Sequence, residues 1–161
     1  MGRNQRDESE KIILLCPART GSQGATGTWS IANNTGVATC AAAQTAATFC
    51  IPVTSLQMGD EIAGFTISGQ LESGGNTATV DADLRVTTAA AADLTDASVV
   101  AITQISKTAD YLINDASAAC SQIVGGGQCY YILVTVTTAA DTDVAIQGAQ
   151  IIIYRKYTEG V

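Results

Sequence analysis

The stretch Asp60–Val86 alternates between apolar and polar residues in two consecutive runs, and this pattern constrains the fold more than any other in the chain. One side of the runs carries Ala63, Phe65, Ile67, Gly69 and Leu71, and then Ala78, Val80, Ala82, Leu84 and Val86. A period of two places such residues on one side of a β-strand. Because Ser73-Gly74-Gly75-Asn76 forms a short Gly-rich link between the runs, the sequence predicts a β-hairpin.

The rest of the chain also consists of short segments typical of strands, separated by turn residues. β-Branched and aromatic residues favour strands, which we expect at Lys11–Cys16, Thr28–Ala32, Phe49–Ile51, Val99–Ile105, Tyr130–Thr137 and Val144–Tyr154. Gly148, inside the last of these segments, indicates a bulge or bend. Asn33–Thr48 has no firm period and is predicted to be mainly loop, whereas Thr87–Ala97 suits either one helical turn or a loop.

These segments amount to about eight strands with no long helical pattern, which predicts an all-β protein, a two-sheet β-sandwich or jelly roll. A chain of 161 residues is the size of one domain. Residues 1–10 are polar and predicted to form a flexible, extended N-terminal arm. Residues 11–161 are then expected to form the single domain.

Charged residues are scarce: they make up 14% of the chain, and the net charge is −7. An average domain has about 25%, so we expect other molecules, most simply copies of the same chain, to cover much of the surface. The alternative is an ordinary exterior rich in Thr and Ser. Arg85 is the only cation between Arg19 and Lys107, which argues against binding to nucleic acid or to an anionic membrane. No signal peptide or membrane span is recognisable in the sequence.

Five cysteines are many for a chain of this size. Their spacing suggests two local disulfides, Cys40–Cys50 and Cys120–Cys129, and leaves Cys16 single. Each disulfide would close a short loop and add about 2–3 kcal/mol of stability. Reduced, buried thiols are the alternative. Zinc suits the spacing less well, because structural zinc sites favour two to four residues between paired cysteines.

The chain has no histidine, which removes the commonest general base and metal ligand. We therefore predict no catalytic residue, no cofactor and no metal site. The pairs Asp81/Asp83 and Asp141/Asp143 could bind calcium or serve a glycosidase. A solvated strand face beside Arg85, and a turn that uses Asp as a hydrogen-bond acceptor, explain them better.

Two further groups of residues have a structural and a functional interpretation. The Gly-rich pieces GSQGATG and VGGGQC do not have the spacing of nucleotide-binding loops and are predicted to be turns. The aromatic residues could form a platform for sugars, although core and interface positions are more typical of a sandwich; they are Trp29, Tyr130, Tyr131, Tyr154 and Tyr157.

The run Leu56–Arg85 begins with an L-x-x-G-D turn formed by Leu56, Gly59 and Asp60. It resembles the small jelly-roll virion structural proteins of tailed bacteriophages, which include capsid decoration proteins. The runs Thr95–Ser106 and Tyr131–Gly148 fit the same group. The first fifty residues and the cysteines depart from it.

The resemblance implies a non-enzymatic capsid decoration or cement protein that stabilises the phage head as a homo-oligomer, a trimer. Its partners would be copies of itself and the major capsid protein or another virion protein. It would be located in the virion, which assembles in the host cytoplasm and is released by lysis. We expect the arm to attach through Arg3, Arg6 and Lys11. The alternative function is a receptor- or glycan-binding module of a tail or fibre head.

Overall fold

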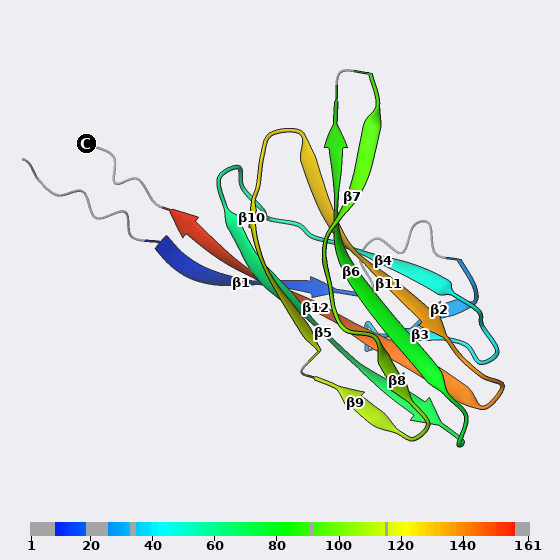
Figure 1. Cartoon of the computed structure of the whole chain (residues 1–161). Coiled ribbons are helices and arrows are strands. Elements are labelled where there is room, and N and C mark those ends of the chain that lie inside the picture. Colours follow the sequence, from blue (N-terminus) through cyan, green and yellow to red (C-terminus); the bar gives the residue numbers. More distant parts are fainter. Residues whose placement is uncertain (1–8, 19–25, 33–34, 91, 115, 157–161) are drawn as a thin grey trace, which may run out of the picture.

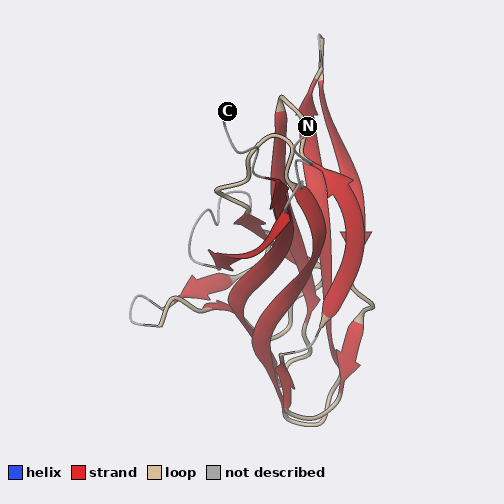
Figure 2. Ribbon diagram, turned by 90° about the vertical axis from the view of Figure 1, so that its left-hand side faces the viewer, coloured by secondary structure: helices blue, strands red, loops and turns tan. Residues whose placement is uncertain are grey.

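The computed structural model describes residues 9–18, 26–32, 35–90, 92–114 and 116–156. Twelve strands in these ranges form two antiparallel sheets that pack face to face (Figures 1 and 2), which confirms the predicted all-β sandwich. The described part contains no helix, and so none that could cross a membrane.

Seven strands form sheet A, in the order β10-β5-β12-β3-β2, with β1 also paired to β12 and β9 to β5. Sheet A contains β1 (Ser9–Pro17), β2 (Trp29–Ile31), β3 (Ala38–Cys40), β5 (Glu61–Ser73), β9 (Tyr111–Ile113), β10 (Ser117–Ile123) and β12 (Thr142–Lys156). Five strands form sheet B, in the order β4-β11-β6-β7, with β8 paired to β6. Sheet B contains β4 (Ala47–Pro52), β6 (Ala78–Ala89), β7 (Leu94–Ala101), β8 (Ile105–Lys107) and β11 (Gln128–Thr137).

The two alternating runs that predicted a hairpin do form strands, β5 and β6, but these strands do not pair with each other. β5 pairs with β12, β10 and β9 in sheet A, whereas β6 pairs with β11, β7 and β8 in sheet B. The hairpin prediction was therefore wrong. The alternation indicates only that one side of each strand is buried. This holds for a strand of either sheet, so the pattern does not show which strands pair.

The predicted inner side of β5 is also shifted at its start. Opposite Ile152 and Ile153 of β12 lie Gly64 and Ile62, so Ala63 is left as an extra residue in a β-bulge. The bulge turns both Ile62 and Phe65 into the core, where they are 0% and 1% exposed. Ala63, which the period placed on the inner side, is only half-buried.

A second bulge lies in β12, where the register against β5 shifts between Ile146 and Gly148. This confirms the irregularity that Gly148 predicted. A Cβ atom at position 148 would lie 2.5 Å from the carbonyl oxygen of Cys16 in β1. Glycine is needed here because the backbones of β1 and β12 approach each other closely.

Thr87–Ala97, predicted to be a helical turn or a loop, instead forms most of a true hairpin. β6 continues to Ala89 and β7 begins at Leu94, so that Thr88 pairs with Thr95. The hairpin projects beyond the rest of the sandwich (Figure 1). The strands β3 and β10 were not predicted, because their small residues have weak strand propensity and they form by pairing with β12 and β5.

The core between the sheets consists mainly of Ile, Val, Leu and Ala side chains, with few aromatic ones. Phe49 and Phe65 are its largest fully buried side chains, and the ring of Trp29 packs against Phe49 with centroids 5.1 Å apart. With one side of each sheet buried in this core, the outer side of each remains to meet solvent or partners.

Candidate docking surface

The predicted disulfides do not form, since all five cysteines are free. Cys40 points into the core from sheet A, whereas Cys50 lies on the outer side of β4 in sheet B. Cys120 belongs to β10 of sheet A, and Cys129 to the outer side of β11 in sheet B. The two cysteines of each predicted pair are close in sequence but belong to different sheets. Sequence spacing alone could not indicate this.

The environment of four of the five thiols suits a structural role. Burial raises the pKa of Cys16, Cys50 and Cys120, and it raises the pKa of Cys40 to about 11. A raised thiol pKa leaves little thiolate at neutral pH, and thiolate is the form that acts as a nucleophile or metal ligand. In the described ranges no three His, Cys, Asp or Glu residues come together as a metal site would require.

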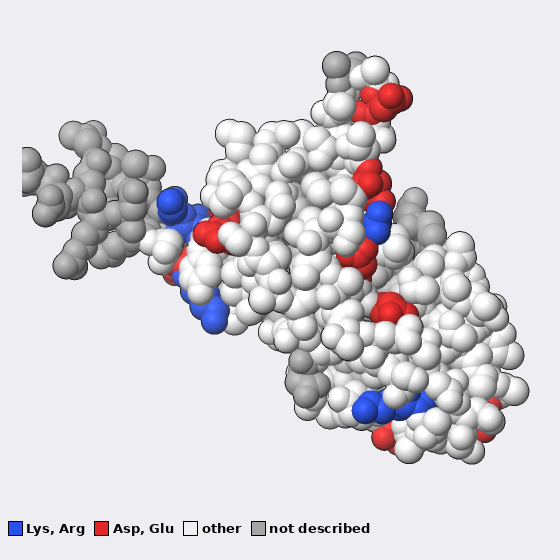
Figure 3. All heavy atoms as spheres, viewed as in Figure 1, with Lys and Arg blue, Asp and Glu red and all other residues white. Residues whose placement is uncertain are grey.

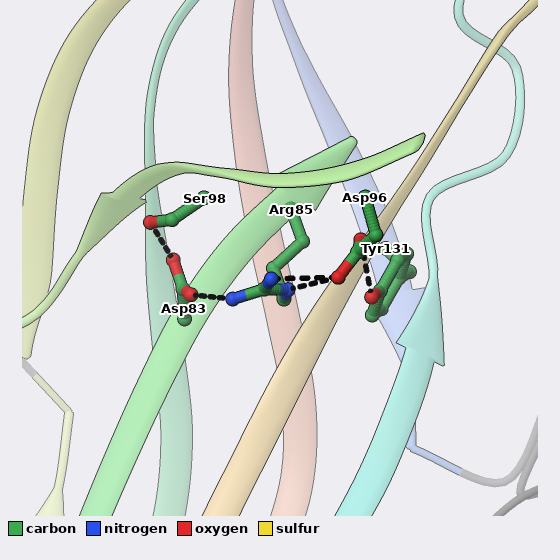
Figure 4. A network of polar contacts seen from close by, with 5 residues as sticks. All are labelled: Asp83, Arg85, Asp96, Ser98 and Tyr131. Carbon is green, nitrogen blue, oxygen red and sulfur yellow. Dashed lines mark hydrogen bonds and ion pairs between the residues drawn. The ribbon is translucent and has the colours of Figure 1, made fainter. Parts of the chain in front are cut away.

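Asp83 belongs to a polar network on the outer side of sheet B (Figure 4). Arg85 donates to Asp83 at 2.7 Å and to Asp96 at 2.6 Å, while Tyr131 donates to Asp96 at 2.7 Å and Ser98 to Asp83 at 2.6 Å. Hydrogen bonds from Arg85 and Tyr131 lower the pKa of Asp96. The network ties β6, β7 and β11 together and satisfies its own carboxylates.

The other carboxylates that the sequence analysis considered are Asp81, Asp141 and Asp143. Asp81 accepts a hydrogen bond from Gln104, and Asp141 accepts one from Asn76. Asp143 is exposed at the start of β12. These positions favour the solvated strand face and the turn acceptor over a calcium or glycosidase site.

The aromatic residues do not gather into one platform. Trp29 packs on Phe49, and Tyr130 is buried with its hydroxyl bonded to Gln128. Tyr131 lies on the outer side of sheet B, and Tyr154 on that of sheet A. Tyr157 lies outside the described residues. In the described part, these side chains therefore serve the core and two separate surfaces.

The proposed attachment residues are only partly described. Lys11 lies in β1, opposite Tyr154 of β12. The flexible arm was predicted to comprise residues 1–10. β1 begins at Ser9, so residues 9 and 10 belong to a strand. Arg3 and Arg6 lie outside the described residues.

The outer side of sheet A is the most distinctive surface of the molecule, because its strand residues carry no charge over most of its length. We call this the neutral surface. Its members come from β1, β5, β9, β10 and β12: Ile13, Leu15, Thr66, Ser68, Gln70, Leu112, Ser117, Ala119, Ala145, Gln147, Gln150 and Ile152.

Charged strand residues appear only toward the two ends of the neutral surface. Lys11 and Glu61 flank Tyr154 at one end, and Glu72 lies opposite Asp143 at the other. Between these ends the register places Leu15, Gln150, Thr66 and Ser117 in one row. The next row contains Ile13, Ile152, Gly64 and Ala119. The surface is therefore continuous across four strands.

The neutral surface combines exposed apolar side chains with shallow hollows. Leu15 is 71% exposed and Leu112 is 62% exposed. Leu112 and Gly69 line a hollow of about 320 Å³, and a second hollow of about 420 Å³ lies beside Ile123 at the charged end. Exposed apolar groups without nearby charges can be buried against a partner at little desolvation cost.

The outer side of sheet B differs, since it carries Asp81, Asp83, Arg85 and Asp96. In Figure 3 the charged groups of the viewed face also lie in a few separate places, with wide uncharged areas between them. The low charged fraction of the sequence was a signal for such a surface. Sequence reasoning did not find its location, because the uncharged residues gather only when β1, β5, β10 and β12 pair.

No family model matches the chain, and no curated protein matches it. Among solved structures, it is weakly similar to the enzymatically active domain of tailspike protein 4 of bacteriophage CBA120, with 16% identity and a TM-score of 0.34 over 90% of this chain and 19% of that one. It also matches a structure of infectious bursal disease virus, Gx strain, with 11% identity and a TM-score of 0.24 over 99% of this chain and 41% of that one. The chain thus spans less than half the length of either structure, and the scores are too low to support an argument about function.

Proposed function

We propose that the chain is a non-enzymatic virion structural protein, a capsid decoration protein that docks on the head of a tailed bacteriophage as a homo-oligomer. The observation that carries the proposal is the neutral surface on the outer side of sheet A. The resemblance of Leu56–Arg85 to small virion proteins of tailed phages supports the same class.

The neutral surface suits docking to another protein for a physical reason. Its small polar residues, such as Thr66 and Ser117, and its exposed apolar ones, such as Leu112, can be buried without stripping water from an ion. Stable interfaces bury about 800 Å² on each partner and exclude charge from their centre. The partner would be the major capsid protein or another virion protein.

Docking of this kind would stabilise the head by mass action. A protein that binds the assembled shell and not its separate subunits favours the assembled state. Several copies linked in one oligomer would add avidity, since each further contact forms within the complex. No reacting group is needed for this function.

Leu112→Glu tests the proposal by placing a charge on the neutral surface, next to Gln70 of β5. Leu94→Glu is the matched control, because Leu94 is 75% exposed but lies on β7 of sheet B. We expect the Leu112 variant to bind purified phage heads at least about tenfold more weakly in co-sedimentation, since a buried unpaired charge costs several kcal/mol. The control should bind as the parent chain does. Equal binding by both variants would contradict the proposal.

A further inference from the structure

β1 (Ser9–Pro17) is a regular strand at the edge of sheet A. It pairs with β12 over all nine residues without a register shift, and no described strand pairs with its other side. The segment Ile12–Cys16 carries no charge. Ile13 is 51% exposed and Leu15 is 71% exposed.

A hydrogen bond next to the end of β1 shows which of its residues bond to β12 and which face the open edge. The amide of Ala18 donates to the carbonyl of Gln147 in β12 at 3.1 Å. In an antiparallel ladder, alternate residues turn both backbone groups toward the same neighbour. The even-numbered residues of β1 therefore bond to β12, whereas Lys11, Ile13 and Leu15 direct their N–H and C=O groups toward the open edge.

The other long edges are protected in ways that β1 is not. In β10 the register shifts between Ala119 and Gln122, and a shift also interrupts β7 where it pairs with β6. β4 is partly covered by an isolated bridge between Thr26 and Thr48. Such bulges and covering contacts are among the usual defences against edge-to-edge pairing. The central part of β1 has none of them.

We propose that the open edge of β1 pairs antiparallel with β1 of a second copy of the chain, across a two-fold axis at Ile13. This register places Ile13 opposite its own copy and Lys11 opposite Leu15. Each of these residues would then exchange two backbone hydrogen bonds with its partner. Pro17, which has no N–H group, would lie opposite Ser9 at the end of the ladder, where a donor is needed least.

The side chains are self-complementary in this arrangement. Ile13 and Leu15 of the two copies would form one apolar cluster, with the aliphatic stem of Lys11 beside Leu15 of the second copy. The two lysines would be four residues apart along the ladder, roughly 13 Å, so their repulsion would be weak. A register centred on Ile12 would bring the lysines closer together, and one centred on Leu14 would place Pro17 opposite Lys11.

The pairing rests on the proposed function for its biological role, because it would join two neutral surfaces into one continuous docking face. It replaces the trimer expected from the resemblance with a two-fold pair. The inference about β1 itself depends only on the edge, and it can be tested in solution without any phage particle.

Sedimentation velocity of the full chain at several concentrations tests the pairing. We expect a dimer. Ile13→Lys should raise its dissociation constant about a hundredfold or more, since it places two ammonium groups against each other at the axis. Leu15→Pro should do the same, because it removes an N–H that faces the open edge and leaves the ladder with β12 intact. Leu112→Lys, with the same change of charge on an exposed residue of β9, should leave the dimer unchanged.

Thermal unfolding would verify that each variant remains folded. A parent chain that stays monomeric up to ~100 μM, or an oligomer that survives both β1 substitutions, would overturn the pairing. The two proposals can be told apart: a monomer that still binds phage heads would remove the pairing and the homo-oligomer but keep the decoration role, and a dimer that binds no head would remove the decoration role alone.

Discussion

At the scale of single residues, the ion pair between Asp60 and Arg155 is the most specific polar contact of the fold. Asp60 is 2% exposed and accepts hydrogen bonds from Nε and Nη2 of Arg155 at 2.8 and 2.7 Å. It also accepts one from the amide of Gln57, while Arg155 donates to the carbonyl of Ser55. The pair fastens the end of β12 to the turn before β5. The hydrogen bonds of Arg155 lower the pKa of Asp60.

Asp60→Asn should lower the free energy of unfolding by roughly 2–4 kcal/mol at pH 7, because it leaves a partly buried guanidinium without its counter-charge. Since the pKa of Asp60 is lowered in the folded state, its contribution is complete above the ordinary carboxyl pKa of about 4 and is lost as the pH falls through the folded value. The gap between parent and variant should therefore shrink toward pH 2.

Urea unfolding at pH 7 and at low pH would measure this gap. Asp143→Asn is the matched control, because Asp143 is exposed and should change stability by less than about 0.5 kcal/mol. An Asp60 variant as stable as the parent chain at pH 7 would show that the pair does not hold β12 in place.

At the scale of elements, the contact between β1 and β12 depends on Gly148. Gly148→Ala should cost roughly 1–3 kcal/mol, as overpacking does, because the new Cβ would meet backbone atoms of Cys16 and Pro17 that no rotamer change can move. Gly126→Ala is the control, since its Cβ would meet only the sulfur of Met58 at 3.7 Å. Chemical denaturation of both variants tests the difference, and equal stability would mean that β1 can shift without cost.

The strands also show what a sequence can and cannot predict about elements. Alternation predicted β5 and β6, and runs of β-branched residues predicted β11 and β12. These predictions succeed because the pattern of buried side chains depends on the residues of the strand itself. Pairing is not local: β5 and β6 carry the same pattern but joined different sheets. For the same reason the bulge at Ala63, the strand β10 and the division of each cysteine pair between the two sheets were missed.

At the scale of the whole molecule, the fold determines where the uncharged residues of a weakly charged chain lie on the surface. The sequence predicted that much of the exterior would be covered, and the fold gathers uncharged residues from β1, β5, β9, β10 and β12 on the outer side of sheet A. Which residues share that side follows from strand order and register, which composition does not contain. The open edge of β1 borders the same surface.

The copy number of the chain in purified phage particles would show whether the protein is a component of the shell. It would be measured by quantitative mass spectrometry against the major capsid protein of the same particles. We expect hundreds of copies per particle, in a fixed ratio to the capsid protein, because a decoration protein occupies repeated positions on the shell. A handful of copies would place the chain on the tail or fibres and contradict the decoration role, and complete absence from the particles would contradict a virion function.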